Sequence, residues 1–454
     1  MIKNLQNLCK KTSRIVFLII GVSTYSQQWE NVGGVQFVSS SDGAFNNLAV
    51  DNNGNYYLSY YDLSVSKGAV QKFNGNVWSY MGGSTGITNG IATYSSLSVD
   101  KTGNVFYTNQ LGYPGSGMEV RQFTGNSWNQ LPLPTTLNLN YHASAVSKNN
   151  ILFTFAGHNS GTVQRYNNGV WENVGTSGFS GNSMFAEMVI GTNDKVYTCN
   201  VSGGNVKVFE NNINAGSSDS WILTGGSFVD QASGSEQYNS DIAIDGNNNL
   251  YVAYVSNSAN GQKLNVKKFN GTVWEQMGSA NFSNGKVQHI AIAVTTSGQT
   301  FVAASRFEND NFLRNTIYKF DSTNQQWTSL GGDYLSDGEA KYNDLVVDNI
   351  NNYLVLTYSE GPVKVRRFAL STLSVKDTDI KKNIGFYPNP TKGIIYLRSQ
   401  NSIKNINITN VLGQGQSFKF FKNQIDISNL SQGVYFVNIQ LNTGQSLVEK
   451  VVKN

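Results

Sequence analysis

The chain has 454 residues, of which 14% are charged and 12% aromatic, and it contains 45 glycines. This length exceeds one ordinary core, and the composition favours many short strands and tight turns over a helical enzyme or a disordered chain. The formal charge of +4 resides in the first 26 residues, and the neutral remainder argues against a nucleic-acid or anionic-membrane partner.

Residues 1–26 have the pattern of a signal peptide. Four basic residues and no acidic one accompany the apolar stretch 15–22, and small residues before Ser26 predict cleavage after it. The apolar stretch is shorter than the roughly 20 residues of a spanning helix, and no other candidate follows. Processing removes Cys9 and leaves Cys199 alone, which excludes a disulfide framework or a cysteine metal site within the mature chain.

One short stretch recurs along the first three quarters of the chain. Residues 73–78, Phe-Asn-Gly-Asn-Val-Trp, combine an aromatic residue, an Asn-Gly turn and a tryptophan. Related copies stand at 123–128, 166–171 and 269–274, and looser ones at 209–221 and 320–327. All seven tryptophans follow this spacing, at positions 29, 78, 128, 171, 221, 274 and 327. A strand-built repeat of about 50 residues is typical of a β-propeller.

Each period predicts four strands. In the first period these are residues 47–51, 56–60, 70–73 and 77–81, bounded by Gly and Asn clusters. The Asn-Gly pair favours a hairpin with a type I′ turn. The inner-strand pattern and the third-strand aromatic each occur seven times, the aromatic as Phe73, Phe123, Tyr166, Phe209, Phe269, Phe320 and Phe368. We therefore expect an all-β fold with seven blades over residues 27–370. Six or eight blades are the alternatives, because the repeat between Trp128 and Trp171 is short.

The two ends of the array complement each other. Phe368 has no tryptophan after it, and Trp29 has no third strand before it. We expect residues 28–33 to supply the outer strand of the last blade, because closure of the ring removes exposed sheet edges.

Segments such as residues 48–57 and 242–252 resemble blades of NHL-type propellers. The turn before each tryptophan also resembles the Asp-box of sialidase-like propellers. It departs from that motif by one residue of spacing and by the frequent lack of an acidic residue. Because of these departures, the resemblance gives little support to sialidase chemistry.

The composition changes after Leu370. Residues 371–383 are polar and predict a linker, and residues 384–454 show short alternating strands with Gly and Pro turns, typical of a small β-sandwich. The motifs include the stretch 386–393, Phe-Tyr-Pro-Asn-Pro-Thr-Lys-Gly, and a final strand around 449–453. This segment resembles the type A C-terminal sorting domain of the bacterial type IX secretion system. The resemblance implies transit through the periplasm, recognition by that secretion machinery, and a secreted or outer-surface location.

Candidate functional residues lie where the inner strands begin, because these positions surround one mouth of a propeller's central channel. The predicted ligand-binding candidates are Asn47, Ser96, His142, Glu187, Asp241 and Asp344. Three carboxylates and a histidine converging there could hold a calcium ion or act as an acid/base pair on a sugar. The alternative is a hydrated channel mouth without chemistry. No recognised metal or catalytic motif stands out, so no metal is assigned.

Two further sets of residues have structural and functional interpretations. Tyrosines such as Tyr94, Tyr141, Tyr238 and Tyr342 could stack on sugar rings or be buried between blades. The aspartates Asp51, Asp100, Asp245 and Asp348 recur at a turn, where a capping role accounts for them.

Two function classes follow from the sequence. The first is an exported propeller that binds a glycan or a surface protein. The second is a secreted hydrolase or lyase that cleaves a polysaccharide or lactone, with its site at the channel mouth. The missing catalytic signature favours the binding module.

Overall fold

The computed structural model describes residues 28–111, 117–134, 139, 141–157, 160–234, 238–309, 312–370, 384–399, 403–411, 414–441 and 446–454. The predicted signal peptide and linker lie outside the described residues. The chain divides into two compact units between Leu370 and Ser371. No described helix has the length and apolar character to cross a membrane.

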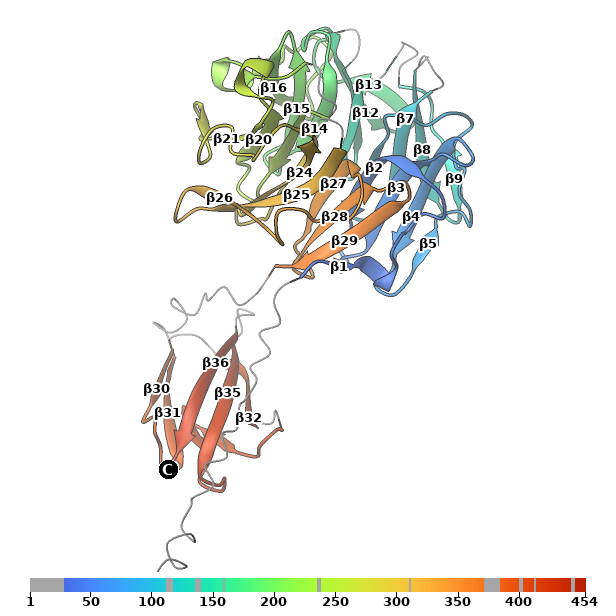
Figure 1. Cartoon of the computed structure of the whole chain (residues 1–454). Coiled ribbons are helices and arrows are strands. Elements are labelled where there is room, and N and C mark those ends of the chain that lie inside the picture. The colour runs from blue at the N-terminus through green and yellow to red at the C-terminus, as the bar shows by residue number, and fades with distance from the viewer. Residues whose placement is uncertain are drawn as a thin grey trace, which may run out of the picture. The chain divides into compact units, whose positions relative to one another are not determined.

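The first unit is a β-propeller, with seven antiparallel blades in its described part (Figure 1). Each blade has four strands in sequential order, and blade 4 carries one extra short strand that pairs with its third. Blades 1 to 3 consist of β2 (Gly43–Val50), β3 (Tyr56–Asp62), β4 (Lys67–Phe73), β5 (Trp78–Tyr80); β6 (Ser96–Val99), β7 (Val105–Gln110), β8 (Met118–Thr124), β9 (Ser127–Gln130); β10 (His142–Val146), β11 (Leu152–Ala156), β12 (Thr162–Asn167) and β13 (Val170–Asn173).

Blades 4 to 7 continue the pattern. They consist of β14 (Met184–Ile190), β15 (Lys195–Ser202), β16 (Asn205–Asn212), β17 (Ile222–Leu223), β18 (Asp230–Gln231); β19 (Ser240–Ile244), β20 (Leu250–Val255), β21 (Leu264–Phe269), β22 (Trp274–Gln276); β23 (Val287–Val294), β24 (Thr300–Asn309), β25 (Phe312–Asp321), β26 (Gln326–Ser329); β27 (Lys341–Asp348), β28 (Tyr353–Ser359), β29 (Val363–Ala369) and β1 (Glu30–Asn31). The described residues also include short 3₁₀ turns, among them η1 (Val32–Gly34), η3 (Thr224–Gly226) and η4 (Ser258–Asn260).

The core of the propeller lies between neighbouring blades. Leu58 and Tyr60 of blade 1, for example, belong to one buried cluster with Val355 and Val363 of blade 7. Burial of these apolar faces is the main stabilising contribution to such a fold. Inner strands of adjacent blades contact each other around the ring, including β27 with β2.

The outer hairpins differ from the predicted turn type. Phe73 pairs with Trp78, so four residues form the loop, and of these Gly75 has a positive φ of 96°. The side chain of Asn74 accepts hydrogen bonds from the N–H groups of Asn76 and Val77, each at 3.0 Å. The hairpin prediction is confirmed, but an Asx-type turn replaces the type I′ turn because Asn74 satisfies the backbone donors itself.

The tryptophans join each blade to the one before it. In six of the seven cases the indole N–H donates to a backbone carbonyl of the preceding blade: Trp78 to Val32, Trp128 to Met81, Trp171 to Pro132, Trp274 to Thr224, Trp327 to Met277 and Trp29 to Leu330. The distances run from 2.7 to 3.1 Å. The recurring stretch is therefore part of the framework.

The N-terminal strand pairs with the last blade. Glu30 lies opposite Arg367 and Asn31 opposite Arg366 in antiparallel register. The ring of Trp29 packs on Phe368 at 5.5 Å between centroids. These contacts are the ones that the complementary ends of the array predict.

Blade 4 departs from the repeat predicted for it. Phe209 pairs with Thr198 and Leu223, two residues earlier in β16 than the third-strand aromatic of blade 1. Trp221 instead stacks on Phe179, with centroids 4.2 Å apart and planes 12° apart. The prediction that Phe209 is the equivalent aromatic is wrong, because the long loop before Trp221 shifts the pairing.

The turn aspartates cap backbone donors, as predicted. Asp51 accepts from the N–H groups of Asn53 and Asn55 and from the hydroxyl of Tyr57. These hydrogen bonds hold the pKa of Asp51 below its ordinary value, although burial acts in the opposite direction.

The second unit is a small β-sandwich. One sheet contains β30 (Ile384–Tyr387), β31 (Ile394–Ser399), β34 (Gln424–Asp426) and β33 (Lys419–Phe421), and the other contains β32 (Ile403–Asn410), β35 (Gly433–Leu441) and β36 (Ser446–Lys453). Ile395, Ile425, Ile408, Val437 and Val451 form the centre of its core. The alternating pattern places these residues on the inner faces.

Candidate functional site

A ring of aromatic side chains lies at the mouth of the channel. Each ring contacts the next, with centroids 4.9 to 5.7 Å apart, in the order Phe45, Tyr94, Tyr141, Phe185, Tyr238, His289, Tyr342 and back to Phe45. Tyr238 also contacts Tyr342 across the ring at 5.9 Å. We call these seven residues the aromatic ring.

Backbone strain positions the aromatic ring. Six of its members have φ between 49° and 58°, a region that bulky residues rarely adopt. A β-bulge interrupts the inner strand at this point in blades 1, 4, 6 and 7. A bulge redirects a side chain, and here the repeated bulge turns an aromatic side chain towards its neighbours in the ring. The tyrosine side chains therefore contact the neighbouring rings at the channel mouth rather than being buried between blades.

Four of the six predicted candidates line one small cavity beneath these rings. Asn47, Ser96, His142 and Glu187 border it, together with Tyr94, Tyr141, Phe185 and Tyr238. Its volume is about 50 Å³, enough for a few water molecules. A sugar residue does not fit in this cavity.

The other two candidates, Asp241 and Asp344, connect adjacent blades. Asp344 accepts from the N–H of Leu345 in its own strand at 2.7 Å and from the N–H of Leu48 in blade 1 at 2.6 Å. Asp241 accepts in the same way from Ile242 and, in blade 6, from Ile292. Ser96 repeats the pattern by accepting from the N–H of Ser144 in blade 3. These side chains satisfy backbone donors between blades.

The three carboxyl groups influence one another. Burial raises the pKa of Asp241 to about 7 and that of Asp344 to about 6, although the hydrogen bonds from backbone N–H groups act in the opposite direction. Burial, together with the charges of Asp241 and Asp344, raises the pKa of Glu187 well above its ordinary value. The cluster therefore retains protons into the neutral range.

His142 is also a buried group of the channel wall. Its Nε2 lies 3.1 Å from the hydroxyl of Thr108, and its Nδ1 has no partner among the described residues. Burial lowers its pKa to about 4, so the ring is neutral at physiological pH.

No group of three or more His, Cys, Asp or Glu side chains in the described residues is arranged to hold a metal ion. Glu187, Asp241 and Asp344 interact through their charges.

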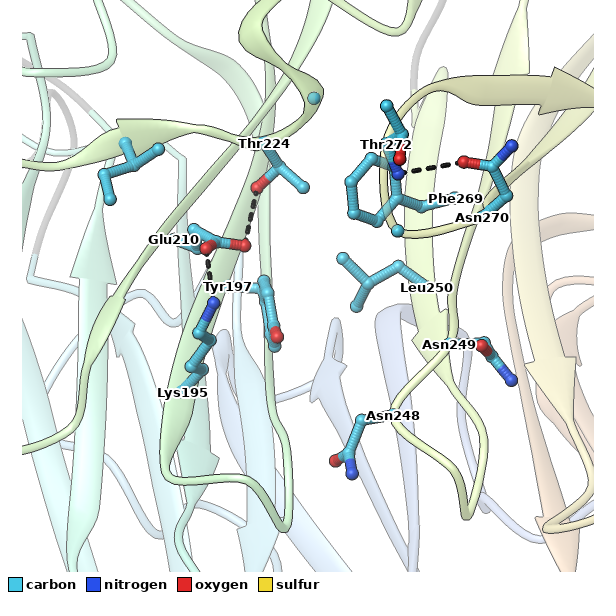
Figure 2. A pocket seen from close by; sticks show the side chains of 13 residues that line it. Lys195, Tyr197, Glu210, Thr224, Asn248, Asn249, Leu250, Phe269, Asn270 and Thr272 are labelled. Carbon is cyan, nitrogen blue, oxygen red and sulfur yellow. Dashed lines mark hydrogen bonds and ion pairs between the residues drawn. The ribbon is translucent and has the colours of Figure 1, made fainter.

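A larger opening lies between blades 4 and 5, and we call it groove 4/5. Figure 2 shows Lys195, Tyr197 and Glu210 of blade 4 facing Phe269 and Asn270 of blade 5. The groove has a volume of about 390 Å³. Lys195 contacts the Glu210 carboxylate at 2.5 Å, and this hydrogen bond raises the pKa of Lys195. The pair leaves the lining with no net charge.

An equivalent opening, groove 1/2, lies between blades 1 and 2. Tyr57, Lys72, Tyr80, Asn104 and Phe123 contribute to its lining, and its volume is about 710 Å³. Tyr57 and Lys72 occupy the same paired positions as Tyr197 and Glu210 in groove 4/5. Aromatic rings and amide groups thus line both openings at one place in the repeat.

The residues that begin the inner strands point to the channel mouth and give no indication of these grooves. A signal was present in the residue directly before each third-strand aromatic. In five of the seven blades that residue is basic, namely Lys72, Arg165, Lys268, Lys319 and Arg367. The overall neutral charge concealed this recurrence of basic side chains.

Comparison with known proteins identifies the C-terminal unit. Residues 385–454 match the family described as the secretion system C-terminal sorting domain. A sorting domain is present. The protein is accordingly exported by the type IX secretion system, to the cell surface or the medium. No curated protein matches the sequence.

Two solved structures of one protein resemble this chain in fold, and a third resembles it more weakly. A PL25 polysaccharide lyase, an ulvan lyase, is 12% identical with a TM-score of 0.53, and the match covers 74% of this chain and 96% of that one. The same lyase bound to -[GlcA(1-4)Rha3S]- gives 0.52 with equal identity and coverage. The SapL1 lectin in complex with alpha methyl fucoside gives 0.46 at 13% identity, covering 65% and 99%. At such identities the lyase likeness concerns the fold.

Proposed function

We propose that this protein is an exported carbohydrate-binding propeller whose sites are the grooves between adjacent blades. The observation that carries the proposal is the recurrence of an open, aromatic-lined and amide-lined groove between two different pairs of blades. Volumes of 390 and 710 Å³ are in the usual range for ligand sites. The sorting domain directs the protein to the cell surface or the medium, where polysaccharides are present.

Aromatic faces and side-chain amides are suited to sugars. A sugar ring presents an apolar face that packs on an aromatic ring and hydroxyl groups that need hydrogen-bond partners. Groove 1/2 offers Tyr80 and Phe123 for the first purpose and Asn104 and Asn126 for the second. Groove 4/5 offers Phe269 with Asn248, Asn249 and Asn270.

The channel mouth supports the alternative enzyme less well. Its cavity holds about 50 Å³, and two of its three carboxylates each accept two backbone N–H groups. Two carboxylates that act on a glycosidic bond need a sugar between them.

A polysaccharide panel tests the proposal. Thr124 lines groove 1/2 and Thr272 lines groove 4/5, and both are exposed. Thr124→Trp combined with Thr272→Trp places an indole in each groove and should weaken binding at least tenfold. Ser329→Trp, at an exposed position outside both grooves, is the matched control and should bind normally.

The same incubations separate binding from catalysis. Binding without release of reducing or unsaturated ends is the expected result. Release of such ends would instead support the polysaccharide- or lactone-cleaving enzyme. Failure of every glycan to bind would overturn the proposal.

A further inference from the structure

One register position of the blades carries a run of basic side chains. It is the third-strand residue that pairs with the second-strand residue facing the groove. Five of the seven described blades place a cation there, namely Lys72 opposite Tyr57, Arg165 opposite Phe153, Lys268 opposite Tyr251, Lys319 opposite Phe301 and Arg367 opposite Val355. The remaining two blades have Gln122 and Glu210.

These cations differ in how they are neutralised. Arg165 contacts Glu172 at 2.8 Å and Arg367 contacts Glu30 at 2.6 Å. The ammonium group of Lys72 instead lies over the ring of Tyr57 at 4.9 Å from its centroid, and no ion pair involves it among the described residues. Cation–π attraction orients such a group but leaves its net charge in place.

The carboxylate next to Tyr57, that of Asp51, already accepts hydrogen bonds within its own turn. Asp51 accepts hydrogen bonds from Asn53, Asn55 and the hydroxyl of Tyr57 and is buried. It therefore caps its own turn and holds the tyrosine ring in place beneath Lys72.

Groove 1/2 is positively charged and open. Lys72 is the single ionisable residue, apart from tyrosine, in its described lining, which contains no Asp or Glu. A side chain added at Gly83, Gly103 or Gly125 would meet no atom within 4 Å, so these glycines leave free space along the groove. Groove 4/5 differs because its Lys195 is paired with Glu210.

We infer that groove 1/2 binds an acidic sugar, with the ammonium group of Lys72 pairing with a carboxylate or sulfate on that sugar. This inference rests on the proposed function and adds the substrate class. The rings of Tyr80 and Phe123 pack against the sugar, and Asn104 and Asn126 lie within the same lining for its hydroxyl groups. A hydrogen bond between the Lys72 ammonium group and an ionised acceptor is roughly twice as strong as one between neutral groups.

Binding of the full chain to three polysaccharides tests the inference. Alginate presents carboxylates, carrageenan presents sulfate esters and laminarin is neutral. Wild-type protein should bind one or both acidic polymers at least tenfold more tightly than laminarin, and the two acidic arms distinguish carboxylate from sulfate. Lys72→Gln should lose about tenfold or more, because a hydrogen bond to a charged group is removed, while Lys72→Arg should retain binding.

Lys268→Gln is the matched control. Its ammonium group lies over Tyr251 at 5.1 Å in the same register, so the substitution removes an equal charge from another blade. Equal losses for Lys72→Gln and Lys268→Gln would indicate general charge attraction and overturn the inference. Unchanged melting temperatures show that both variants are folded.

The outcomes also separate this inference from the proposed function. Equal binding of laminarin and the acidic polymers, with no effect of Lys72→Gln, overturns the acidic-sugar inference and leaves the carbohydrate-binding proposal standing. If no polysaccharide binds to the wild-type protein, the carbohydrate-binding proposal itself fails.

Discussion

The carboxyl group of Glu187 shows how the channel modifies a single residue. It shares the channel with Asp241 and Asp344, and burial and their charges raise its pKa well above 4.5. Cluster formation of this kind can suggest catalysis. Here burial raises the pKa values of the neighbouring carboxyl groups, and these groups accept hydrogen bonds from backbone N–H groups, which is a structural role.

Replacing Glu187 by Gln should stabilise the protein more at pH 8 than at pH 5. A raised pKa in the folded state means that the folded chain binds a proton more readily than the unfolded chain. The stability from this group is present below about pH 4.5 and is lost as the pH rises through the folded value. The difference in unfolding free energy between Glu187→Gln and wild type should therefore grow by about 1–2 kcal/mol.

Comparison with wild type at each pH is essential for this measurement. His142 and His289 have pKa values lowered to about 4 and about 3, so their stabilising contribution is lost as the pH falls below about 6.5. Their contributions cancel when the unfolding free energy of wild type is subtracted from that of the variant at the same pH. Asp51→Asn is the control of opposite sign, because a lowered pKa makes its loss more costly at pH 8 than at pH 3. A difference for Glu187→Gln that does not change with pH would contradict the prediction.

At the level of elements, the blades are linked by their outer hairpins. The indole N–H of Trp128 donates to the backbone carbonyl of Met81 at 2.8 Å, and Met81 belongs to the preceding blade. Trp221 is the exception, since its Nε1 has no partner among the described residues and its ring stacks on Phe179. The recurring tryptophan therefore forms the hydrogen bond to the preceding blade at Trp128 and, within the described part of the chain, lacks a partner for its N–H at Trp221.

Trp128→Phe should destabilise the propeller more than Trp221→Phe. Both changes remove similar aromatic area, but only the first leaves a backbone carbonyl without its donor. We expect an additional loss of about 1 kcal/mol for Trp128→Phe, measured by calorimetry or denaturant unfolding of the full chain. Equal losses would show that stacking, not the indole hydrogen bond, links the blades.

At the scale of the whole molecule, the N-terminal strand and the last blade meet. Gly331 has φ +94°, and a Cβ there would lie 2.7 Å from Cδ1 of Trp29. Gly75 has nearly the same φ, +96°, and a Cβ there would meet nothing within 4 Å. The two glycines separate backbone strain from contact with the N-terminal segment.

Gly331→Ala should be more destabilising than Gly75→Ala. Positive φ alone costs about 1–2 kcal/mol for a residue with a Cβ, and both variants incur this cost. The clash with Trp29 adds to it only in Gly331→Ala and should raise hydrogen exchange in residues 28–33. If exchange there is the same in both variants, the N-terminal strand does not complete the last blade.

The sequence by itself determined the repeat, its count and the export route. The tryptophan spacing, the strand patterns and the offset between Trp29 and Phe368 follow from local periodicity, which each period displays in full. The sorting-domain motifs are likewise local. Strand ends were less accurate, since the first inner strand was expected at 47–51 and spans Gly43–Val50.

Only the tertiary structure decided what the recurring residues contact. The roles of Asp241 and Asp344 depend on the next blade, about 50 residues away, and the aromatic ring depends on all seven blades at once. Groove 1/2 also exists only where two blades meet. A sequence records which residue occupies each blade, but only the ring of blades places Lys72 in an open groove whose described lining contains no acidic residue.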